Sequence, residues 1–315
     1  MESLNTAIMK IIQFDTYGDS GVLQLKQAEK PHAGENEILI KVAAATVNPF
    51  DMKVRSGSMQ KMIHLNLPWV PGSDAAGTIE AVGSGVSRLK VGDKVFATTF
   101  GGTYAEYVVV KEDQAALIPK NVSLPEAAAL SIPIVTSYTF LVQGGELKKG
   151  QRVLIHGAAG GVGGIMVQMA KALGAYVIGT ASGEGIDLVR SFGADEVIDH
   201  KKQDFTELVK DADLVIDLVG GETQAKSFGV VKKGGKLLSA VMPPSQELAQ
   251  QYGITAQFIS SEASYKKLEF GAKLVEEGKI KIKIARTLKL EDAGKAQDLL
   301  SAGGVNGKVV LIVAD

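Results

Sequence analysis

The chain has 315 residues, of which 45% are hydrophobic, 36 are glycine and none is cysteine, and its formal net charge is −1. This length predicts two domains, each large enough to bury a core of its own. The lack of cysteine excludes disulfides and thiolate-held metal ions, and the balanced charge argues against nucleic acid as a partner.

The first part of the chain predicts many short strands. Residues 1–8 lack the basic start and the apolar core of a signal peptide, so we expect a short tail there. No apolar run reaches the ~20 residues of a membrane span, which predicts no membrane partner and, by default, a cytoplasmic location. Strands with glycine turns between them predict a partly open antiparallel barrel. These strands are expected over 9–14, 23–26, 37–45, 72–82, 94–97 and 104–110.

The pattern changes near residue 121. Ser123-Leu124-Pro125-Glu126 is a capping box with proline in the first turn, which predicts a helix start. Six apolar strands then alternate with helices, which predicts an α/β fold with a doubly wound, parallel six-stranded sheet. These strands are expected over 153–156, 176–180, 196–199, 214–218, 236–241 and 254–259.

The last part of the chain lies beyond the sixth strand, so we expect it to return to the first domain. It predicts helices over 265–277 and 291–301 and strands over 280–285 and 308–314. The expected domains are therefore 1–121 with 262–315, and 122–261.

A glycine-rich turn within residues 152–180 is the most informative motif. A strand enters it, and a helix leaves it, in a unit of ~30 residues. The usual dinucleotide fingerprint GxGxxG falls here on Ala158, Gly160 and Gly163. Gly160 would let the backbone approach a pyrophosphate, Gly163 would let the helix pack close to the strand, and the helix N-terminus offers free N–H groups. The alternative is a tight turn that binds nothing.

The end of the second strand indicates which dinucleotide binds. This strand ends in Thr180-Ala181-Ser182, without the acidic residue that commonly holds the ribose of NAD. Neutral hydroxyls tolerate a 2′-phosphate, so the sequence favours NADPH. NADH stays possible, because Glu184 can reach back to the ribose. His200 and Lys201 are candidates to pair with the phosphate, or are ordinary surface residues.

Four further segments resemble the zinc-independent quinone oxidoreductase and enone reductase branch of the medium-chain dehydrogenase/reductase superfamily. They are VNPFDMKVRSG (47–57), PGSDAAG (71–77), GTYAEY (102–107) and the terminal GKVVL (307–311). The resemblance implies a Rossmann domain and a GroES-like domain that is built from both chain ends. Zinc alcohol dehydrogenases of this superfamily hold their metal with Cys and His. In this chain the corresponding segment reads PGSDAAG, so no zinc is expected.

The absence of zinc bears on the reaction. Oxidation of a simple alcohol usually needs that Lewis acid. Hydride transfer to a quinone or to the C=C of an α,β-unsaturated carbonyl does not, because the incoming charge spreads onto an oxygen that hydrogen-bond donors can stabilise. We therefore expect an NADPH-dependent quinone or enone reductase. The alternative is an NADPH-binding protein without catalysis, since crystallins related to this branch show that the scaffold can be reused.

The resemblance also implies site residues in the first domain. Asn48 is expected to border the nicotinamide and the substrate, or else to cap the Pro49 turn. Lys53 is expected to stabilise an enolate, or else to be a solvated lysine. Tyr104 would line the substrate pocket, or pack in the core. Asp51 and Asp74 are possible acids. Asp74 stands in an apolar run, and we expect it to make a structural hydrogen bond instead.

The expected cofactor contacts come from the turn, from the sheet edge and from the terminal GK. Thr136 lies where the resemblance puts a hydroxyl against the nicotinamide ribose or the phosphates. The full set is Thr136, Ala158, Gly160, Gly161, Val162, Gly163, Thr180, Ser182, His200, Val219, Ser239, Ala240, Gly307 and Lys308. Residues 254–259 (ITAQFI) form an uncharged outer strand, and the resemblance implies a homodimer that pairs through it.

Overall fold

The computed structural model describes residues 7–314, which form two compact units. Unit 1 comprises 7–132, 263–272 and 284–314, and unit 2 comprises 133–262 and 273–283. Of the tail expected over residues 1–8, residues 1–6 lie outside the described residues. The first strand begins at Ile8. The expected domain boundaries, 121/122 and 261/262, stay a prediction beside these units.

Unit 2 contains a parallel six-stranded sheet in the order β10-β9-β8-β11-β12-β13. The order reverses between β8 and β11, as it does in a doubly wound dinucleotide-binding fold, and the predicted fold class is confirmed. The strands are β8 (Arg152–Ile155), β9 (Tyr176–Ala181), β10 (Glu196–Asp199), β11 (Ala212–Asp217), β12 (Val231–Ser239) and β13 (Thr255–Phe258).

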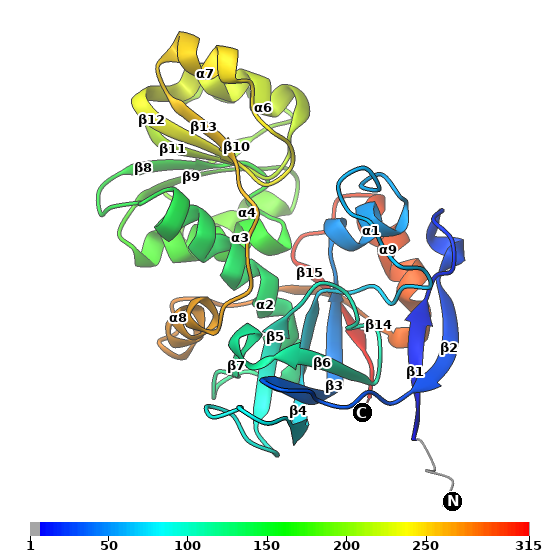
Figure 1. Ribbon diagram of the computed structural model, residues 1–315. Coiled ribbons are helices and arrows are strands. Elements are labelled where there is room, and N and C mark those ends of the chain that lie inside the picture. The colour runs from blue at the N-terminus through cyan, green and yellow to red at the C-terminus, as the bar shows by residue number, and fades with distance from the viewer. Residues whose placement is uncertain (1–6, 315) are drawn as a thin grey trace, which may run out of the picture. The chain divides into compact units, whose positions relative to one another are not determined.

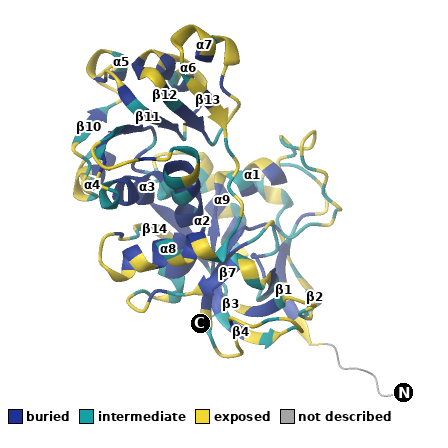
Figure 2. Cartoon of the chain, turned by 60° about the vertical axis from the view of Figure 1, so that its left-hand side comes forward, coloured by how far each residue is buried: buried dark blue, intermediate teal, exposed yellow. Residues whose placement is uncertain are grey.

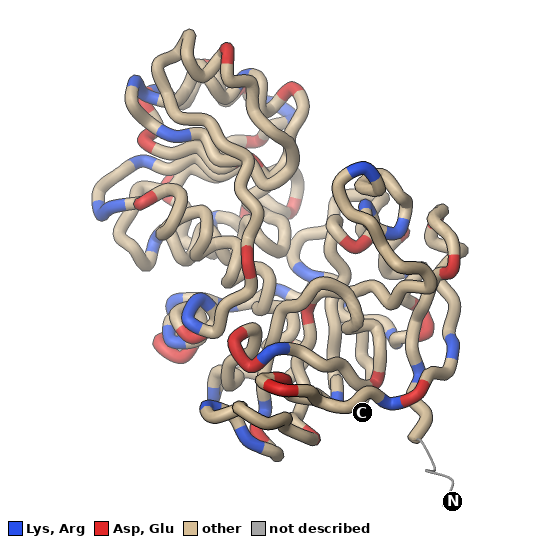
Figure 3. The backbone as a smooth tube through the Cα atoms, in the orientation of Figure 1, with Lys and Arg blue, Asp and Glu red and all other residues tan. Residues whose placement is uncertain are grey.

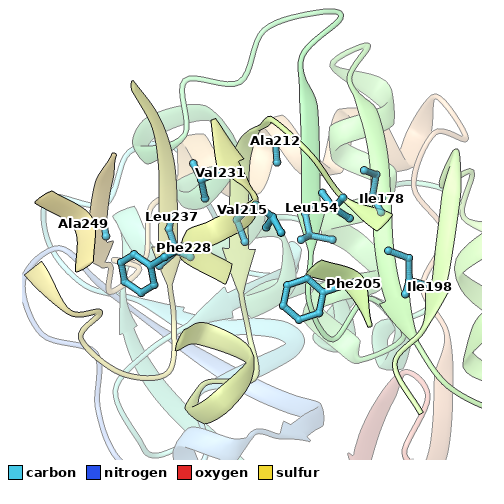
Figure 4. Close-up of a cluster of buried hydrophobic side chains, with 13 residues drawn as sticks. Leu154, Ile178, Ile198, Phe205, Ala212, Val215, Phe228, Val231, Leu237 and Ala249 are labelled. Atoms are coloured by element: carbon cyan, nitrogen blue, oxygen red, sulfur yellow. The ribbon is translucent and has the colours of Figure 1, made fainter. Parts of the chain in front are cut away.

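Helices cover both faces of this sheet, with α3 and α4 on one side and α6 and α7 on the other (Figure 1). They are α3 (Gly161–Ala172), α4 (Gly185–Ser191), α5 (Phe205–Leu208), α6 (Gly221–Ser227) and α7 (Gln246–Tyr252). Most of α3 is buried, whereas α7 is largely exposed (Figure 2). Figure 4 shows the core between the sheet and its helices, where Leu154 and Val215 come from central strands and Phe205 and Phe228 from the covering segments.

Unit 1 is built on a largely antiparallel sheet that follows the path β14-β15-β3-β4-β5-β7, with β6 paired to β3. Its strands are β3 (Glu37–Val47), β4 (Asp74–Val82), β5 (Lys94–Thr98), β6 (Tyr107–Lys111), β7 (Ala115–Leu117), β14 (Ile284–Lys289) and β15 (Lys308–Ile312). A separate hairpin joins β1 (Ile8–Gln13) to β2 (Gln24–Glu29). The expected GroES-like domain is confirmed.

Both chain ends contribute to the sheet of unit 1. β15 lies between β14, to which it is parallel, and β3, to which it is antiparallel. The expected return of the chain is therefore correct. The strand expected over 280–285 is wrong in its bounds, because Ile280 is buried outside any strand and Lys281 exchanges two hydrogen bonds with the Gln168 side chain, at 2.8 and 2.9 Å.

The helices of unit 1 are short. They are α1 (Pro49–Arg55) and α9 (Ala293–Ser301), while α2 (Leu124–Tyr138) and α8 (Tyr265–Glu276) each run across a division between the units. The predicted capping box holds, since the amide and hydroxyl of Ser123 both donate to Glu126, at 2.8 and 2.7 Å. Helix α1 was not predicted, because Asn48-Pro49 signals a strand end more clearly than a helix start.

One helical run is longer and more apolar than the sequence analysis expected. Leu124–Gly144 spans 21 residues and has the length and composition of a membrane span. However, 67% of its most apolar window is buried inside the fold. A helix buried in a folded core is also apolar on most of its circumference. Figure 3 shows charges of both signs interspersed along the rest of the chain.

Candidate functional site

The glycine-rich turn of unit 2 connects β8 to α3. Helix α3 begins after Gly160, so the N–H groups of residues 161–163 belong to its first turn, where no intrahelical acceptor exists. A Cβ added at Gly163 would lie 2.2 Å from the carbonyl oxygen of Gly157 and 2.8 Å from the Cα of Ala158. Only glycine therefore permits this approach of helix to turn, as the sequence analysis inferred.

The other glycines of the motif have different roles. Gly157 has a φ of +73°, a conformation that side chains rarely adopt. A Cβ on Gly160 would approach only the Gly157 carbonyl oxygen, at 3.4 Å, so the fold itself tolerates a side chain there. The expected reason for glycine at position 160, the approach of a pyrophosphate, is consistent with this open space.

A cavity of about 450 Å³ adjoins the turn at the carboxyl ends of β8, β9 and β10. Three residues that are expected to contact the cofactor line this cavity, namely Thr180, His200 and Val219. The complete lining is His156, Gly157, Thr180, His200, Lys201, Lys202, Gln203, Asp204, Phe205, Val219, Glu222, Thr223 and Lys226.

His156 is a buried member of this lining that sequence reasoning missed. Its ring nitrogens lie 3.2 Å from the Thr180 hydroxyl and 3.0 Å from the Ser227 hydroxyl, and its ring packs edge-on against Phe205. Burial lowers the pKa of His156 to about 4, so it is neutral at pH 7. The Thr180 hydroxyl also accepts the Gly157 amide at 3.3 Å, and it therefore braces the turn.

The cavity lining carries more positive than negative charge. Lys226 pairs with Glu222 at 2.8 Å, and Lys202 lies 3.8 Å from Asp199. By contrast, the ammonium of Lys201 has no ion-pair partner among residues 7–314. Lys201 is therefore the most available cation of this lining for an anionic ligand, and it adjoins His200.

Asp217, the last residue of β11, holds the segments that follow β11 and the end of β12. One carboxylate oxygen of this buried residue accepts the amides of Val219 and Gly220, at 3.0 and 2.7 Å. The other oxygen accepts the Ser239 hydroxyl at 2.8 Å, and the Ala240 amide donates to the Asp217 carbonyl at 3.0 Å. Ser239 and Ala240 thus shape this edge through Asp217, and their contact with a cofactor stays a prediction.

The remaining expected cofactor contacts of unit 2 are more peripheral. Ser182 is half-buried beyond the end of β9, outside the lining of the cavity, and Glu184 is exposed. Thr136 is buried near the end of α2. It lies far from the start of this helix at Leu124, and its contact with a cofactor stays a prediction.

Unit 1 contains a buried network around Lys308. Lys308 is 4% exposed, and its ammonium lies 2.6 Å from the Asn48 side-chain oxygen and 3.2 Å from Asp74. The Asn48 amide nitrogen in turn donates to Asp74 at 3.0 Å. Asp74 also accepts the Thr46 hydroxyl and, at 2.8 Å, the Ile132 amide. The structural role expected for Asp74 is thus correct.

The network continues to Asp51 on α1. This carboxylate accepts the Asn48 backbone amide at 2.9 Å and the Ser73 hydroxyl at 3.0 Å, and the Tyr104 hydroxyl lies 3.5 Å away. Burial raises the pKa of Asp51 to about 6, and it raises the pKa of Tyr104 well above its usual value. Tyr104 is fully buried in the core, which matches the second of the two roles considered for it.

These contacts describe how Asn48, Lys53 and Lys308 are placed. The polar atoms of Asn48 are committed to Asp74 and Lys308, and its backbone begins α1. Lys308 is the first residue of β15 and is buried, and it follows Gly307, whose φ is +108°. Lys53 is exposed on α1, and no ion pair involves its ammonium within residues 7–314. The contacts expected of these residues with a cofactor or substrate stay predictions.

No group of three or more potential metal ligands occurs among residues 7–314. Asp74 stands in the segment where the resemblance would put the zinc-binding histidine, and its neighbours are a lysine ammonium and an amide rather than metal ligands. This donor set does not fit a zinc ion.

Two protein-family models match the chain. Residues 34–120 match the alcohol dehydrogenase GroES-like domain, and residues 192–311 match a model described as zinc-binding dehydrogenase. The second description concerns the family, since this chain has no cysteine.

Individual proteins match over nearly the whole chain. The quinone oxidoreductase of Mus musculus is 32% identical over 97% of this chain and 98% of its own. The 2-methylene-furan-3-one reductase of Solanum lycopersicum is 37% identical over 96% of this chain and 79% of its own. The structure of Escherichia coli quinone oxidoreductase complexed with NADPH superposes with a TM-score of 0.88 at 30% identity, over 98% of this chain and all of the other.

These matches agree with the six-stranded parallel sheet, the GroES-like unit and the glycine-rich turn. The chain is an oxidoreductase that belongs to the quinone oxidoreductase and enone reductase branch of the medium-chain dehydrogenase/reductase superfamily.

Proposed function

We propose that this protein is an NADPH-dependent, zinc-free reductase of quinones or of the C=C bond of α,β-unsaturated carbonyls. The observation that carries the proposal is the turn at residues 157–163, where the N-terminus of α3 packs against the turn as closely as glycine allows. The relatives support the acceptor class, because one is named a quinone oxidoreductase and another a furanone reductase.

The residues of unit 2 fit a phosphorylated dinucleotide. The free N–H groups of residues 161–163 would hold the pyrophosphate. The cavity next to the turn would take the adenosine, and the ammonium of Lys201, which has no ion-pair partner in the described chain, would pair with the 2′-phosphate together with His200. When bound, the reduced nicotinamide supplies a hydride. The neighbour solved with NADPH supports this choice over NADH.

The residues of unit 1 suit the acceptor. Reduction of a quinone or an enone places negative charge on an oxygen, and a cation near that oxygen lowers the barrier. Lys53 is exposed and has no ion-pair partner within residues 7–314, so its charge is available for this role. Asn48 would act by holding the start of α1, because Asp74 and Lys308 already engage its side chain.

A homodimer through β13 is part of the proposal. The outer edge of this strand has no pairing partner in the described chain, and three of its four residues are exposed. The Ile259 amide donates to Ser239 on β12, so the amides at 255 and 257 also point inward, while those at 256 and 258 point outward. A second copy would therefore bond to residues 256 and 258.

We propose a cytoplasmic location.

Steady-state assays test the reductase. NADPH consumption with quinones and alkenals, and little with simple ketones, is the expected outcome. Saturable NADPH binding without turnover of any acceptor would instead favour the non-catalytic alternative. Lys201→Ala should raise the KM for NADPH about ten-fold, the equivalent of ~1.4 kcal/mol, and leave the KM for NADH unchanged. Lys233→Ala, another exposed lysine of unit 2, is the matched control.

Lys53→Ala tests the role of the acceptor cation. We expect kcat with enones to fall roughly ten-fold, because one charge that stabilises the enolate is lost. Lys61→Ala removes an exposed lysine just beyond α1 and should leave kcat unchanged. Equal rates for the Lys53→Ala and Lys61→Ala variants would refute the assignment of Lys53.

A further inference from the structure

Three aromatic side chains of unit 1 form a cluster that the site described above does not use. The ring of Phe100 lies 5.4 Å from that of Trp69 and 5.9 Å from that of Phe50, between ring centroids. Both pairs are tilted or edge-to-face, within the usual range for interacting rings. Phe100 is 49% exposed, so the cluster presents an aromatic surface to solvent.

The backbone holds this cluster in place. The amides of Trp69 and Phe14 each donate to the other residue's carbonyl oxygen, at 3.0 Å. Gly101 has a φ of +83°, and a Cβ there would lie 2.4 Å from the indole ring of Trp69. Gly102 donates to Val70 at 2.8 Å. The segment after Phe100 is thus fitted against the indole by glycine and by a backbone bond.

The cluster adjoins the element that carries the proposed acceptor cation. Phe50 and Lys53 are three residues apart on α1, and residues at this spacing lie on one face of a helix. Phe50 is half-buried and Lys53 exposed, so that face reaches solvent. An aromatic surface and a cation therefore lie side by side on unit 1.

This arrangement matches the chemistry of a flat, conjugated acceptor. An exposed, fixed aromatic surface gains stacking energy with a planar ring, and it loses little side-chain entropy because its rings are already ordered. A short acyclic enal has no ring to stack. A ring acceptor held there would also have its developing negative charge near a lysine.

We propose that Phe50, Trp69 and Phe100 form a stacking site for the ring of a quinone, and that this site makes the enzyme prefer ring acceptors to acyclic enals. The inference rests on the proposed function and specifies its acceptor.

Trp69 is the only tryptophan of the chain, so intrinsic tryptophan emission reports directly on the cluster. The full-length protein with oxidised NADP⁺, which does not allow turnover, is titrated with menadione, and a parallel titration of free tryptophan corrects for absorbed light. We expect saturable quenching by menadione and none by crotonaldehyde. Phe100→Ala should raise the apparent Kd for menadione about five-fold, in line with the loss of one aromatic contact.

Leu117→Ala, which truncates another exposed apolar residue of unit 1, should leave this Kd unchanged. Quenching that rises linearly with menadione, or the same Kd in the Phe100→Ala variant, would overturn the stacking site. Circular dichroism of each variant verifies that it is folded, which is expected because both side chains are exposed.

Turnover separates this inference from the proposed function. In the Phe100→Ala variant, the ratio of kcat/KM for menadione to that for crotonaldehyde should fall about five-fold. An unchanged ratio, with turnover of both acceptors, would refute the stacking site and leave the reductase intact. Saturable quenching without NADPH consumption by either acceptor would refute the reductase and leave the stacking site intact.

Discussion

Replacing Lys308 by methionine removes the only cation of the buried network while keeping most of the side-chain volume. Asp74 is fully buried, and its carboxylate would lose the ammonium 3.2 Å away. It would keep three donors, from Thr46, Asn48 and the Ile132 amide. Breaking a buried ion pair from one side costs about 3–5 kcal/mol, and the remaining donors put the expected loss near the lower figure.

A loss of about 3 kcal/mol is a large share of the 5–15 kcal/mol that stabilises a typical protein. With a urea dependence of about 2 kcal/mol per molar, the unfolding midpoint should fall by about 1.5 M. Trp69 lies in unit 1 with Lys308, so its emission follows the unfolding of this unit even when unit 2 unfolds separately.

The matched control is Lys295→Met. Lys295 pairs with Asp292 at 2.7 Å, but its side chain is 79% exposed, so its removal should cost less than ~1 kcal/mol. A second variant, Lys308→Met with Asp74→Asn, removes the orphaned charge and should recover about half of the loss. If the urea midpoints of Lys308→Met and Lys295→Met agree, the reasoning about a buried counterion is refuted.

Three more outcomes follow from the geometry. Gly163→Ala should lower both the melting temperature and the affinity for NADPH, because its methyl group would lie 2.2 Å from the Gly157 carbonyl oxygen. Gly160→Ala should lower the affinity alone. An equal fall in melting temperature in the two variants would contradict this reasoning. Asp51 has its pKa raised to about 6 by burial, so the stability it contributes is greatest below pH 4 and is lost as pH rises through 6. The free energy of unfolding of Asp51→Asn minus that of wild type should therefore increase by up to about 3 kcal/mol as the pH rises from 4 to 7. A difference that does not change with pH would show that this carboxyl does not titrate in that range. Phe258→Pro should give monomers by size-exclusion chromatography because its amide points outward, whereas Gln257→Pro should damage β12–β13 pairing instead; a dimer that survives Phe258→Pro would exclude this edge.

The sequence was most informative where local signals and the global fold agree. In unit 2, all six strands were expected, β10 at the same residues and four others within two residues of their observed ends. β12 begins five residues earlier than expected, at Val231, because its first part carries lysines and glycines rather than an apolar run. The tight approach at Gly163 also followed from the motif, because only a missing side chain explains glycine at that position.

Long-range contacts limited what could be predicted. Lys308 and Asn48 are 260 residues apart in the chain, and no local pattern shows that their side chains meet. The role of His156 was missed for the same reason, since its partners Thr180 and Ser227 come from other elements. The one sequence signal for this role is the position of His156 directly before Gly157, where the glycine motif begins.

The position of β15 between β14 and β3 in the unit 1 sheet has a consequence for biosynthesis. Chains emerge from the ribosome at about 5–20 residues per second, N-terminus first, and domains generally fold as units. Both segments of unit 2, residues 133–262 and 273–283, are complete before β14 and β15 have been translated. Until Lys308 leaves the exit tunnel, the part of β3 that pairs with β15 has no partner strand on that side, and the Asp74 carboxylate lacks the Lys308 ammonium. The sheet of unit 1, whose strand β3 is made early, is therefore completed only after all of unit 2 has been made.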